Sequence, residues 1–302
     1  MPRGWPLRWA APLAWLPFLA PASPAPGIGQ FRLTMLDVGQ GEAIVVETAH
    51  HRLLYDAGPG VESTRAGERV VVPYLRARGA RAIDALMISH ADADHAGGAP
   101  AVLEALPVRQ LIGSLPRGNR LWRLARAAGV RDALVCTAGQ RWQWDGVHFE
   151  VLWPVRDPGT GTAWQARSAN GGSCVLSVRA GAHAALLTSD IDRRAEQALM
   201  AREPAALAAD ILVVPHHGSR SSSSEPFVDA VGPRGAWFPL GNANRFRHPH
   251  PSVWARYVDR AIPLARSDRD GQVDVVLGGA AAGEALAMVR YRERHRRYWM
   301  GR

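Results

Sequence analysis

Residues 86–98 read LMISHADADHAGG. The apolar start of this stretch predicts a strand that ends at Ser89, and Gly97-Gly98 lets the chain turn tightly into a helix. Four potential metal ligands follow the strand within six residues: His90, Asp92, Asp94 and His95. Imidazole and carboxylate together suit Zn²⁺, Mn²⁺ or Fe. We therefore expect a metal centre here; the alternative is a polar turn with solvated acids.

Two later segments have the same design. Residues 184–188 predict a strand that is followed by Asp190, and residues 210–214 predict another that is followed by Pro215-His216-His217. In an α/β sheet the carboxyl ends of parallel strands share one edge, where functional sites gather. A lone Asp after a strand is usually a helix cap. It is the combination of three segments that predicts one shared site.

The rest of the chain alternates apolar strands with helices from Phe31 onward. Strands are expected at 31–36, 43–48, 52–55, 84–89, 147–152, 174–179, 184–188, 211–214, 235–240 and 273–277, and helices at 69–79, 98–106, 119–128, 192–202, 225–231 and 252–261. This spacing indicates a layered α/β architecture. Residues 154–172 show no periodicity and are expected to form a long loop.

Composition limits the class of protein. The chain has 302 residues, 47% apolar and 21% charged, which excludes collagen-like, disordered and disulfide-scaffold proteins. It contains no Lys, so all 36 basic residues are Arg, and the net charge is +9. Six Arg and one Glu lie in residues 290–302, so +5 of this charge is in the tail. The body is mildly basic, which permits a nucleic-acid partner without demonstrating one.

The cysteines and the tryptophans can each be interpreted in two ways. Cys136 and Cys174 could form one bridge, but we expect two separate, semi-buried residues. The eleven Trp could stack on nucleobases, but most lie in apolar segments and are expected in the core. Trp142 and Trp144 alternate on a predicted hairpin and fit both readings.

The first 29 residues form a signal-like or membrane-proximal segment and linker. Arg3 and Arg8 precede an apolar run, Trp9 to Ala22, that is shorter than the roughly 20 residues needed to span a bilayer. It suits a signal-peptide core or the end of a membrane helix, and a meaningless extension is the third reading. In the first two cases the arginines predict an extracytoplasmic or membrane-associated protein. Residues 281–302 are expected to be a basic extension.

The motifs HxDxDHxGG, SD and PHHGS, which occur in this order, resemble those of the metallo-β-lactamase superfamily. A closer likeness is to the C-terminal domain of ComEC-type DNA-internalisation competence proteins, over about residues 30–280. It rests on motifs that occur in order: LDVGQG at 36–41, YDAG at 55–58, 89–98, Asn170 with Ser173, PHHGSRSSSS at 215–224, NRFRHPH at 244–250 and RSDRDG at 266–271. The resemblance implies one αββα four-layer sandwich, an α/β fold of the metallo-β-lactamase type, at residues 30–280.

The resemblance also implies a ligand set for two divalent metal ions, Mn or Zn, with no organic cofactor. His90 would bind the first metal, with Asp92 in place of the usual second His, a replacement that favours Mn²⁺. The second metal would be bound by three side chains: Asp94, His95 and His217. Asp190 would bridge both metals. His216 competes with His217 for its role and otherwise supports the ligands. The usual middle His is absent, and nearby His183 is expected at the surface.

The implied chemistry is attack by a metal-activated water on a phosphoryl group. Asp94 would act catalytically through its metal, and His248 would protonate the leaving alkoxide. Asp37 would support a metal-binding loop. Substrate phosphate would contact four side chains: Ser219, Arg220, Ser221 and His250. Alternatives are a flexible polar linker for the serine run and structural roles for the two histidines.

We therefore expect a metal-dependent phosphodiesterase or nuclease that acts on DNA, as a single strand or another phosphodiester substrate, in competence-related uptake. ComEC-type proteins carry this domain behind a membrane channel that is not expected in this chain, so the resemblance implies a fragment or a free-standing relative, with such a channel as a candidate partner. One alternative is another hydrolase of this fold, for a lactam, thioester or small phosphoester. Another is a non-catalytic module that binds DNA or a channel.

Overall fold

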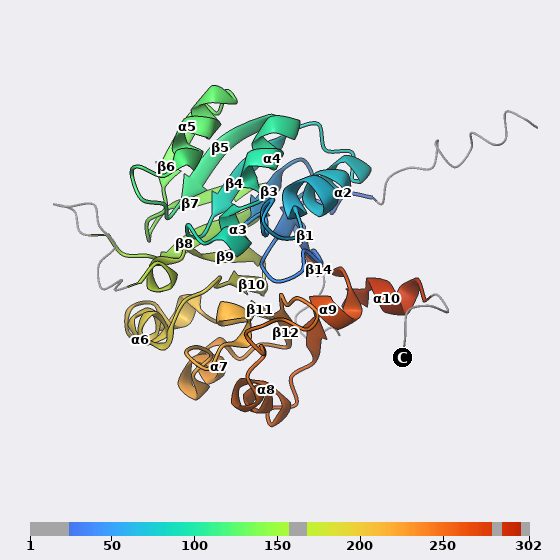
Figure 1. Cartoon of the computed structure of the whole chain (residues 1–302). Coiled ribbons are helices and arrows are strands. Elements are labelled where there is room, and N and C mark those ends of the chain that lie inside the picture. Colours follow the sequence, from blue (N-terminus) through green and yellow to red (C-terminus); the bar gives the residue numbers. More distant parts are fainter. Residues whose placement is uncertain (1–23, 157–167, 280–285, 297–302) are drawn as a thin grey trace, which may run out of the picture.

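The computed structural model describes residues 24–156, 168–279 and 286–296. The apolar run from Trp9 to Ala22, most of the predicted loop and much of the basic tail lie outside these residues. Figure 1 shows two stacked sheets with helices on their outer faces. Among the described helices, none is long and apolar enough to cross a bilayer.

The first sheet is formed mainly by the N-terminal half of the described chain. Its strands are β1 (Gln30–Met35), β2 (Ile44–Glu47), β3 (Arg52–Tyr55), β4 (Ile83–Ile88), β5 (Val108–Gly113), β6 (Asp132–Val135), β14 (Val273–Gly278) and β15 (Val289–Arg290). Their order across the sheet is β15-β14-β1-β2-β3-β4-β5-β6. The pairs from β3 to β6 are parallel, with Leu53 opposite Ala85. Their carboxyl ends therefore lie at one edge.

The second sheet is formed by the following part of the chain. Its strands are β7 (Arg141–Trp144), β8 (Val147–Trp153), β9 (Val175–Ala180), β10 (His183–Leu187), β11 (Ile211–Val213), β12 (Gly235–Phe238) and β13 (Leu264–Arg266). They run in the order β13-β12-β11-β10-β9-β8-β7, and the pairs from β10 to β13 are parallel. This sheet thus has its own shared edge of carboxyl ends.

Helices cover both outer faces. The first sheet packs against the π-helical turn η2 (Gly67–Val71) and α2 (Val72–Ala77), α4 (Ala99–Ala105) and α5 (Arg120–Ala127), and the second against α6 (Arg193–Arg202), α7 (Glu225–Val231) and α8 (Pro251–Val258). A third buried cluster, which includes Phe31, Tyr55, Phe149 and Trp237, fills the space between the sheets. These four layers confirm the predicted αββα sandwich.

Short remaining elements connect these layers. They are α3 (Ala93–Ala96), α9 (Ser267–Asp270), α10 (Tyr291–Arg294) and the 3₁₀ turns η3 (Asn170–Gly172), η4 (Pro204–Ala206) and η5 (Pro215–Gly218). Local chemistry explains several helix ends. Asn119 accepts a hydrogen bond from the Leu121 N–H at the start of α5, and Asp192 caps α6 through the N–H groups of Arg194 and Ala195. Gly232 ends α7 in the left-handed region.

Two sequence expectations about composition are decided by the fold. Cys136 and Cys174 are joined as a disulfide and are fully buried, so the expectation of two separate residues is wrong. Their proximity depends on the stacking of the two sheets, because Cys136 follows β6 and Cys174 precedes β9. Trp142 and Trp144 are partly buried against the core between the sheets, in contact with Phe149. Their positions favour the interpretation that they pack in the core instead of stacking on nucleobases.

Candidate metal centre

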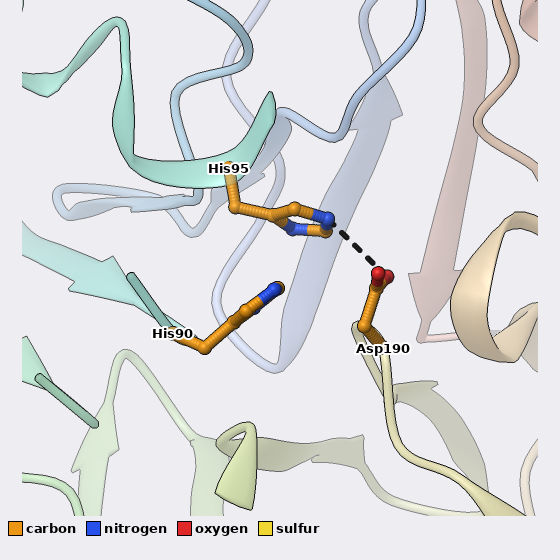
Figure 2. A group of neighbouring side chains, drawn as sticks. All are labelled: His90, His95 and Asp190. Atoms are coloured by element: carbon orange, nitrogen blue, oxygen red, sulfur yellow. Dashed lines mark ion pairs between the residues drawn. The ribbon is translucent and has the colours of Figure 1, made fainter. Parts of the chain in front are cut away.

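The proposed ligands lie where the strands of both sheets end. His90 follows β4, and His95 lies on the short helix α3 that begins after it. Asp190 follows β10, and His217 lies in η5 after β11. The stacked sheets bring these four side chains together from both halves of the sandwich. Figure 2 shows the rings of His90 and His95 directed toward the Asp190 carboxylate.

One group of side chains surrounds the Nε2 atom of His95. This atom lies 3.2 Å from Asp190 Oδ1, 3.2 Å from His217 Nε2 and 3.9 Å from Asp94 Oδ2. His217 Nε2 lies 3.4 Å from Asp94 Oδ2 and 3.5 Å from Asp190 Oδ1. His95, His217 and Asp190 are buried, whereas 31% of the Asp94 side chain is exposed. The group is therefore open to solvent on the side of Asp94.

The other ring nitrogens fix which atoms face this group. Nδ1 of His95 donates to Asp56 Oδ2 at 2.7 Å, and Nδ1 of His217 donates to the Pro239 carbonyl at 2.8 Å. In the neutral rings, both Nε2 atoms then carry lone pairs. Two nitrogen lone pairs and two carboxylates facing one another repel unless a cation lies among them. This donor set fits a divalent metal ion.

A second group lies around His90. Its Nε2 is buried without a hydrogen bond in the described residues and lies 3.5 Å from Asp92 Oδ2. His90, His95 and Asp190 form another set whose ligand atoms are within 4.8 Å of one another. His216 approaches Asp190 from the solvent side, with its Nε2 3.5 Å from Oδ2. Asp190 therefore contacts both groups, which is the position expected of a bridging carboxylate.

The charged side chains of this site shift one another's pKa values. Burial acts to lower the pKa of His95, but the Asp190 and Asp56 carboxylates outweigh it and hold this pKa well above its usual range. Burial acts to raise the pKa of Asp94, but a hydrogen bond from His217 and the charge of His95 bring it down to about 2. Burial lowers the pKa of His216. The Asp94 carboxylate is thus ionised at neutral pH, as metal binding requires, whereas the His95 ring must release a proton when a metal ion binds.

Residues that the sequence did not assign complete the site. Asp56 accepts hydrogen bonds from the Ser89 backbone N–H and hydroxyl, at 2.7 and 2.6 Å, besides the one from His95. The Ser189 hydroxyl donates to Ser89 at 2.7 Å. Buried Glu42 joins Asp56 and His95 in a further acidic group. The position of Asp56 after β3, a neighbour of β4, is the sequence signal that could have identified it.

Two other expectations need correction. Asp37 does not contact the ligand groups: its carboxylate pairs with Arg292 at 2.8 Å, and the supporting role belongs to Asp56. His183 is buried instead of exposed, with Nδ1 3.3 Å from Asp210 Oδ2. It begins β10, at the opposite end of this strand from Asp190, so it cannot replace the missing His. Asn170 lies there instead, 3.3 Å from the Asp190 carboxylate.

The serine run after His217 is an ordered loop, not a flexible linker. Ser222 and Ser223 are buried: Ser222 donates to the Pro215 carbonyl, and Ser223 accepts from the Tyr257 hydroxyl at 3.0 Å. Both carboxylate oxygens of Glu196 accept backbone N–H groups of this loop. The residues predicted to contact substrate, Ser219, Arg220 and Ser221, are the more accessible ones, and the Ser221 hydroxyl lies 3.3 Å from His216 Nδ1.

The two histidines before α8 have different surroundings. Burial is the main cause that lowers the pKa of His248 to about 4, so the neutral ring predominates near pH 7. Its predicted role as general acid stays a prediction. Nδ1 of His250 accepts from the Ser252 N–H and caps α8, which is a structural role, and its predicted contact with substrate stays a prediction.

Comparison with known families now identifies the fold. A sequence model of the metallo-beta-lactamase superfamily matches residues 36–241, a range that includes every proposed ligand. The chain belongs to the metallo-β-lactamase superfamily. Proteins of this superfamily normally bind divalent metals, and the His and Asp groups described above could hold them.

Relatives of this metallo-β-lactamase-fold chain include competence proteins. Competence protein ComA of Neisseria gonorrhoeae is 35% identical over 300 residues, which are 99% of this chain and 39% of that protein. ComE operon protein 3 of Bacillus subtilis is 33% identical over 258 residues, 79% of this chain and 32% of that protein. The predicted likeness to competence proteins is confirmed. The chain spans well under half the length of these relatives.

Solved structures support the fold. Igni18, described as a metallo hydrolase from Ignicoccus hospitalis, aligns with a TM-score of 0.51 at 12% identity. The alignment covers 80% of this chain and 98% of Igni18. At this identity the likeness concerns the fold alone.

Proposed function

We propose that this chain is a metal-dependent phosphodiesterase that hydrolyses DNA during competence-related uptake. The observation that carries the proposal is the convergence of His95, His217, Asp94 and Asp190 on one solvent-accessible point at the strand ends. Divalent ions in such a site supply a water nucleophile at neutral pH and neutralise charge on phosphoryl oxygens. We propose Mn²⁺ or Zn²⁺, bound in two neighbouring positions.

This chain's own residues have distinct parts in the proposed reaction. Asp94, His95 and His217 would hold one ion, His90 and Asp92 the other, and Asp190 would contact both. Asp56 holds the ring of His95 in the orientation that leaves Nε2 free. The Ser221 hydroxyl lies beside His216 and contacts that of Ser219, and Arg220 between them is exposed; these three side chains would bind phosphate oxygens.

DNA is the substrate that the relatives favour, because one of them is named as a competence protein. We propose that the chain works outside the cytoplasm or at the membrane, next to a DNA-uptake channel, as residues 1–29 suggest. A reporter enzyme fused after Gly29 tests this placement. Export of an active reporter supports the proposal, and activity confined to the cytoplasm contradicts it.

Steady-state hydrolysis of a fluorescent single-stranded oligonucleotide, with Mn²⁺ and Zn²⁺ compared, tests the reaction. Asp94→Ala should abolish turnover while the far-UV circular dichroism spectrum stays unchanged, because Asp94 is partly exposed and outside the core. Asp229→Asn, which removes an exposed carboxylate that pairs with Arg260, is the matched control and should retain turnover. Undiminished turnover in Asp94→Ala would contradict the proposal.

A second candidate is a non-catalytic module that binds DNA or a channel. It is favoured by the group around His90, where Asn170 occupies the place of an imidazole and Asp92 replaces another. Metal content separates the candidates. Two equivalents of metal per chain support an enzyme, whereas none, together with no turnover in any metal, supports the binding module.

A further inference from the structure

The loop of residues 242–250 carries an exposed aromatic ring at the site entrance. It connects β12 to α8, and Phe246 at its tip is 49% exposed, between the exposed Arg245 and Arg247. Phe246 belongs to none of the three buried clusters of the described residues. The ring is therefore accessible to solvent and lies beside two positively charged residues.

Phe246 and a proposed metal ligand line the same cavity. This cavity, of about 490 Å³, has Asp94 and Gln40 on its wall together with Arg245 and Phe246. A second cavity of about 600 Å³ is lined by Arg247 and His248 of the same loop. The loop therefore contributes to two cavities, and Phe246 lines the one that contains Asp94.

Ring contacts connect Phe246 to the site. Its ring stacks on His248, with centroids 5.7 Å apart and planes 15° apart, and the His248 ring lies 6.0 Å from that of His216. The Arg245 guanidinium carbon lies 4.8 Å from the centroid of the Phe246 ring. Two ring contacts thus connect Phe246 to His216, whose Nε2 lies 3.5 Å from the Asp190 carboxylate.

Hydrogen bonds within the loop hold its conformation. The Asn244 amide donates to the carbonyls of Gly241 and His248, at 3.2 and 2.8 Å, and accepts the His248 N–H at 2.8 Å. Ala243 and Arg247 have φ values of +50° and +56°, a region that non-glycine residues rarely occupy. Such conformations persist where the surroundings enforce them. The loop therefore holds Phe246 at the surface, with His248 and Arg245 against its ring.

We propose that Phe246 is a nucleobase-stacking residue, which holds a base of the strand whose phosphate lies at the metal centre. The Arg245 guanidinium lies over this ring, and it moves off the ring to bind a flanking phosphate of the same strand when a base stacks there. An aromatic face accepts every base, so the site takes single-stranded nucleic acid with little sequence preference. A base inside a duplex already stacks on its neighbours and cannot use this ring. The position of the scissile phosphate rests on the proposed function; the stacking itself does not.

Binding of two matched oligonucleotides tests the stacking. Fluorescence anisotropy in EDTA, where no metal supports hydrolysis, gives Kd for an oligothymidylate and for an abasic strand of equal length and charge. The purified chain should bind the base-containing strand about 5-fold to 100-fold more tightly. Phe246→Ala should bring this ratio close to one, and Phe246→Trp should keep it. Tyr291→Ala removes another exposed ring, stacked on His295, and should leave the ratio unchanged.

The outcomes separate stacking from catalysis. A ratio near one in the unaltered chain, or an unchanged ratio in Phe246→Ala, overturns the stacking proposal even if the chain hydrolyses DNA with Mn²⁺. A ratio that depends on Phe246 supports it even if no metal gives turnover, a result that overturns the proposed hydrolysis instead. Arg245→Gln should weaken both strands alike and reduce the slope of log Kd against log salt by about 0.7; an unchanged slope contradicts the phosphate contact.

Discussion

Gly41 packs directly against the main chain of Asp94. The ideal position of a Cβ atom on Gly41 overlaps the Asp94 carbonyl oxygen, which also accepts the Glu42 N–H at 3.1 Å. Gly41 has a φ of +142°, a value that side chains rarely allow. The loop after β1 and the helix that carries Asp94 and His95 are thus in backbone contact. A substitution in this loop should therefore displace the backbone that carries the proposed metal ligands Asp94 and His95.

Gly41→Ala should destabilise the protein by more than about 1 kcal/mol, because the methyl group meets backbone and the φ is strained. It should also lower metal affinity, since α3 must move. Gly118→Ala is the matched control, because a Cβ there meets no atom within 4 Å. Urea denaturation and metal titration measure both effects. Equal stability of the two variants would contradict the close packing.

Asp190→Ala should remove most of the bound metal, because this carboxylate contacts both ligand groups. Inductively coupled plasma mass spectrometry of the purified variant measures the metal content. The exposed Asp229→Asn variant should keep the content of the unaltered chain. Equal metal content in Asp190→Ala and the unaltered chain would show that the ions bind elsewhere.

Asp56→Asn should weaken metal binding by about 10-fold to 100-fold without removing a ligand, because Asp56 orients the His95 ring. Competition with a chelator of known affinity measures the change. The effect should be smaller than that of Asp190→Ala. An affinity equal to that of the unaltered chain would mean that the ring is oriented by other contacts.

Arg220→Ala should raise KM for an oligonucleotide about 10-fold or more and change kcat little, because a charge-assisted hydrogen bond to phosphate is lost. Arg220 is exposed, and its backbone carbonyl accepts from Arg193. Arg109→Ala is the control, since Arg109 lies near the amino end of β5, away from the strand edge with the site. A fall in kcat at constant KM would contradict a binding role.

Asp145 should make stability depend on pH. Burial acts to raise its pKa, but hydrogen bonds from Thr48, His50 and His51 outweigh it and hold the pKa well below its usual range. A depressed pKa contributes stability that is present above the unfolded value, about 4, and is lost as pH falls through the folded value.

Asp145→Asn should therefore lower the free energy of unfolding at about pH 6, and its difference from the unaltered chain should shrink below about pH 4. Urea denaturation across this range measures the difference. The exposed Asp132→Asn serves as a control, with a difference that stays small at every pH. A difference for Asp145→Asn that is constant down to pH 3 would contradict the assignment.

Much of the fold follows from local patterns. Apolar runs such as 52–55 and 225–231 coincide with β3 and α7, because their residues are buried and their ends carry turn or cap signals. The sequence did not predict β5 or β6. β5 mixes polar and apolar residues, and β6 is an exposed edge strand with no buried face. Its pairing with β5 depends on a neighbouring strand, not on its own pattern.

The sequence by itself determined which residues are candidates for the site. Ligands such as His90 and Asp190 follow apolar strands, and the carboxyl ends of parallel strands lie at one edge of a sheet. Only the tertiary structure decided how these side chains meet. His216 and His217 are neighbours in sequence, yet left-handed φ values of 51° and 53° turn His217 into the buried group and leave His216 toward solvent. The partners of His95 come from β3 and from the opposite sheet, and such contacts arise only when the two sheets stack.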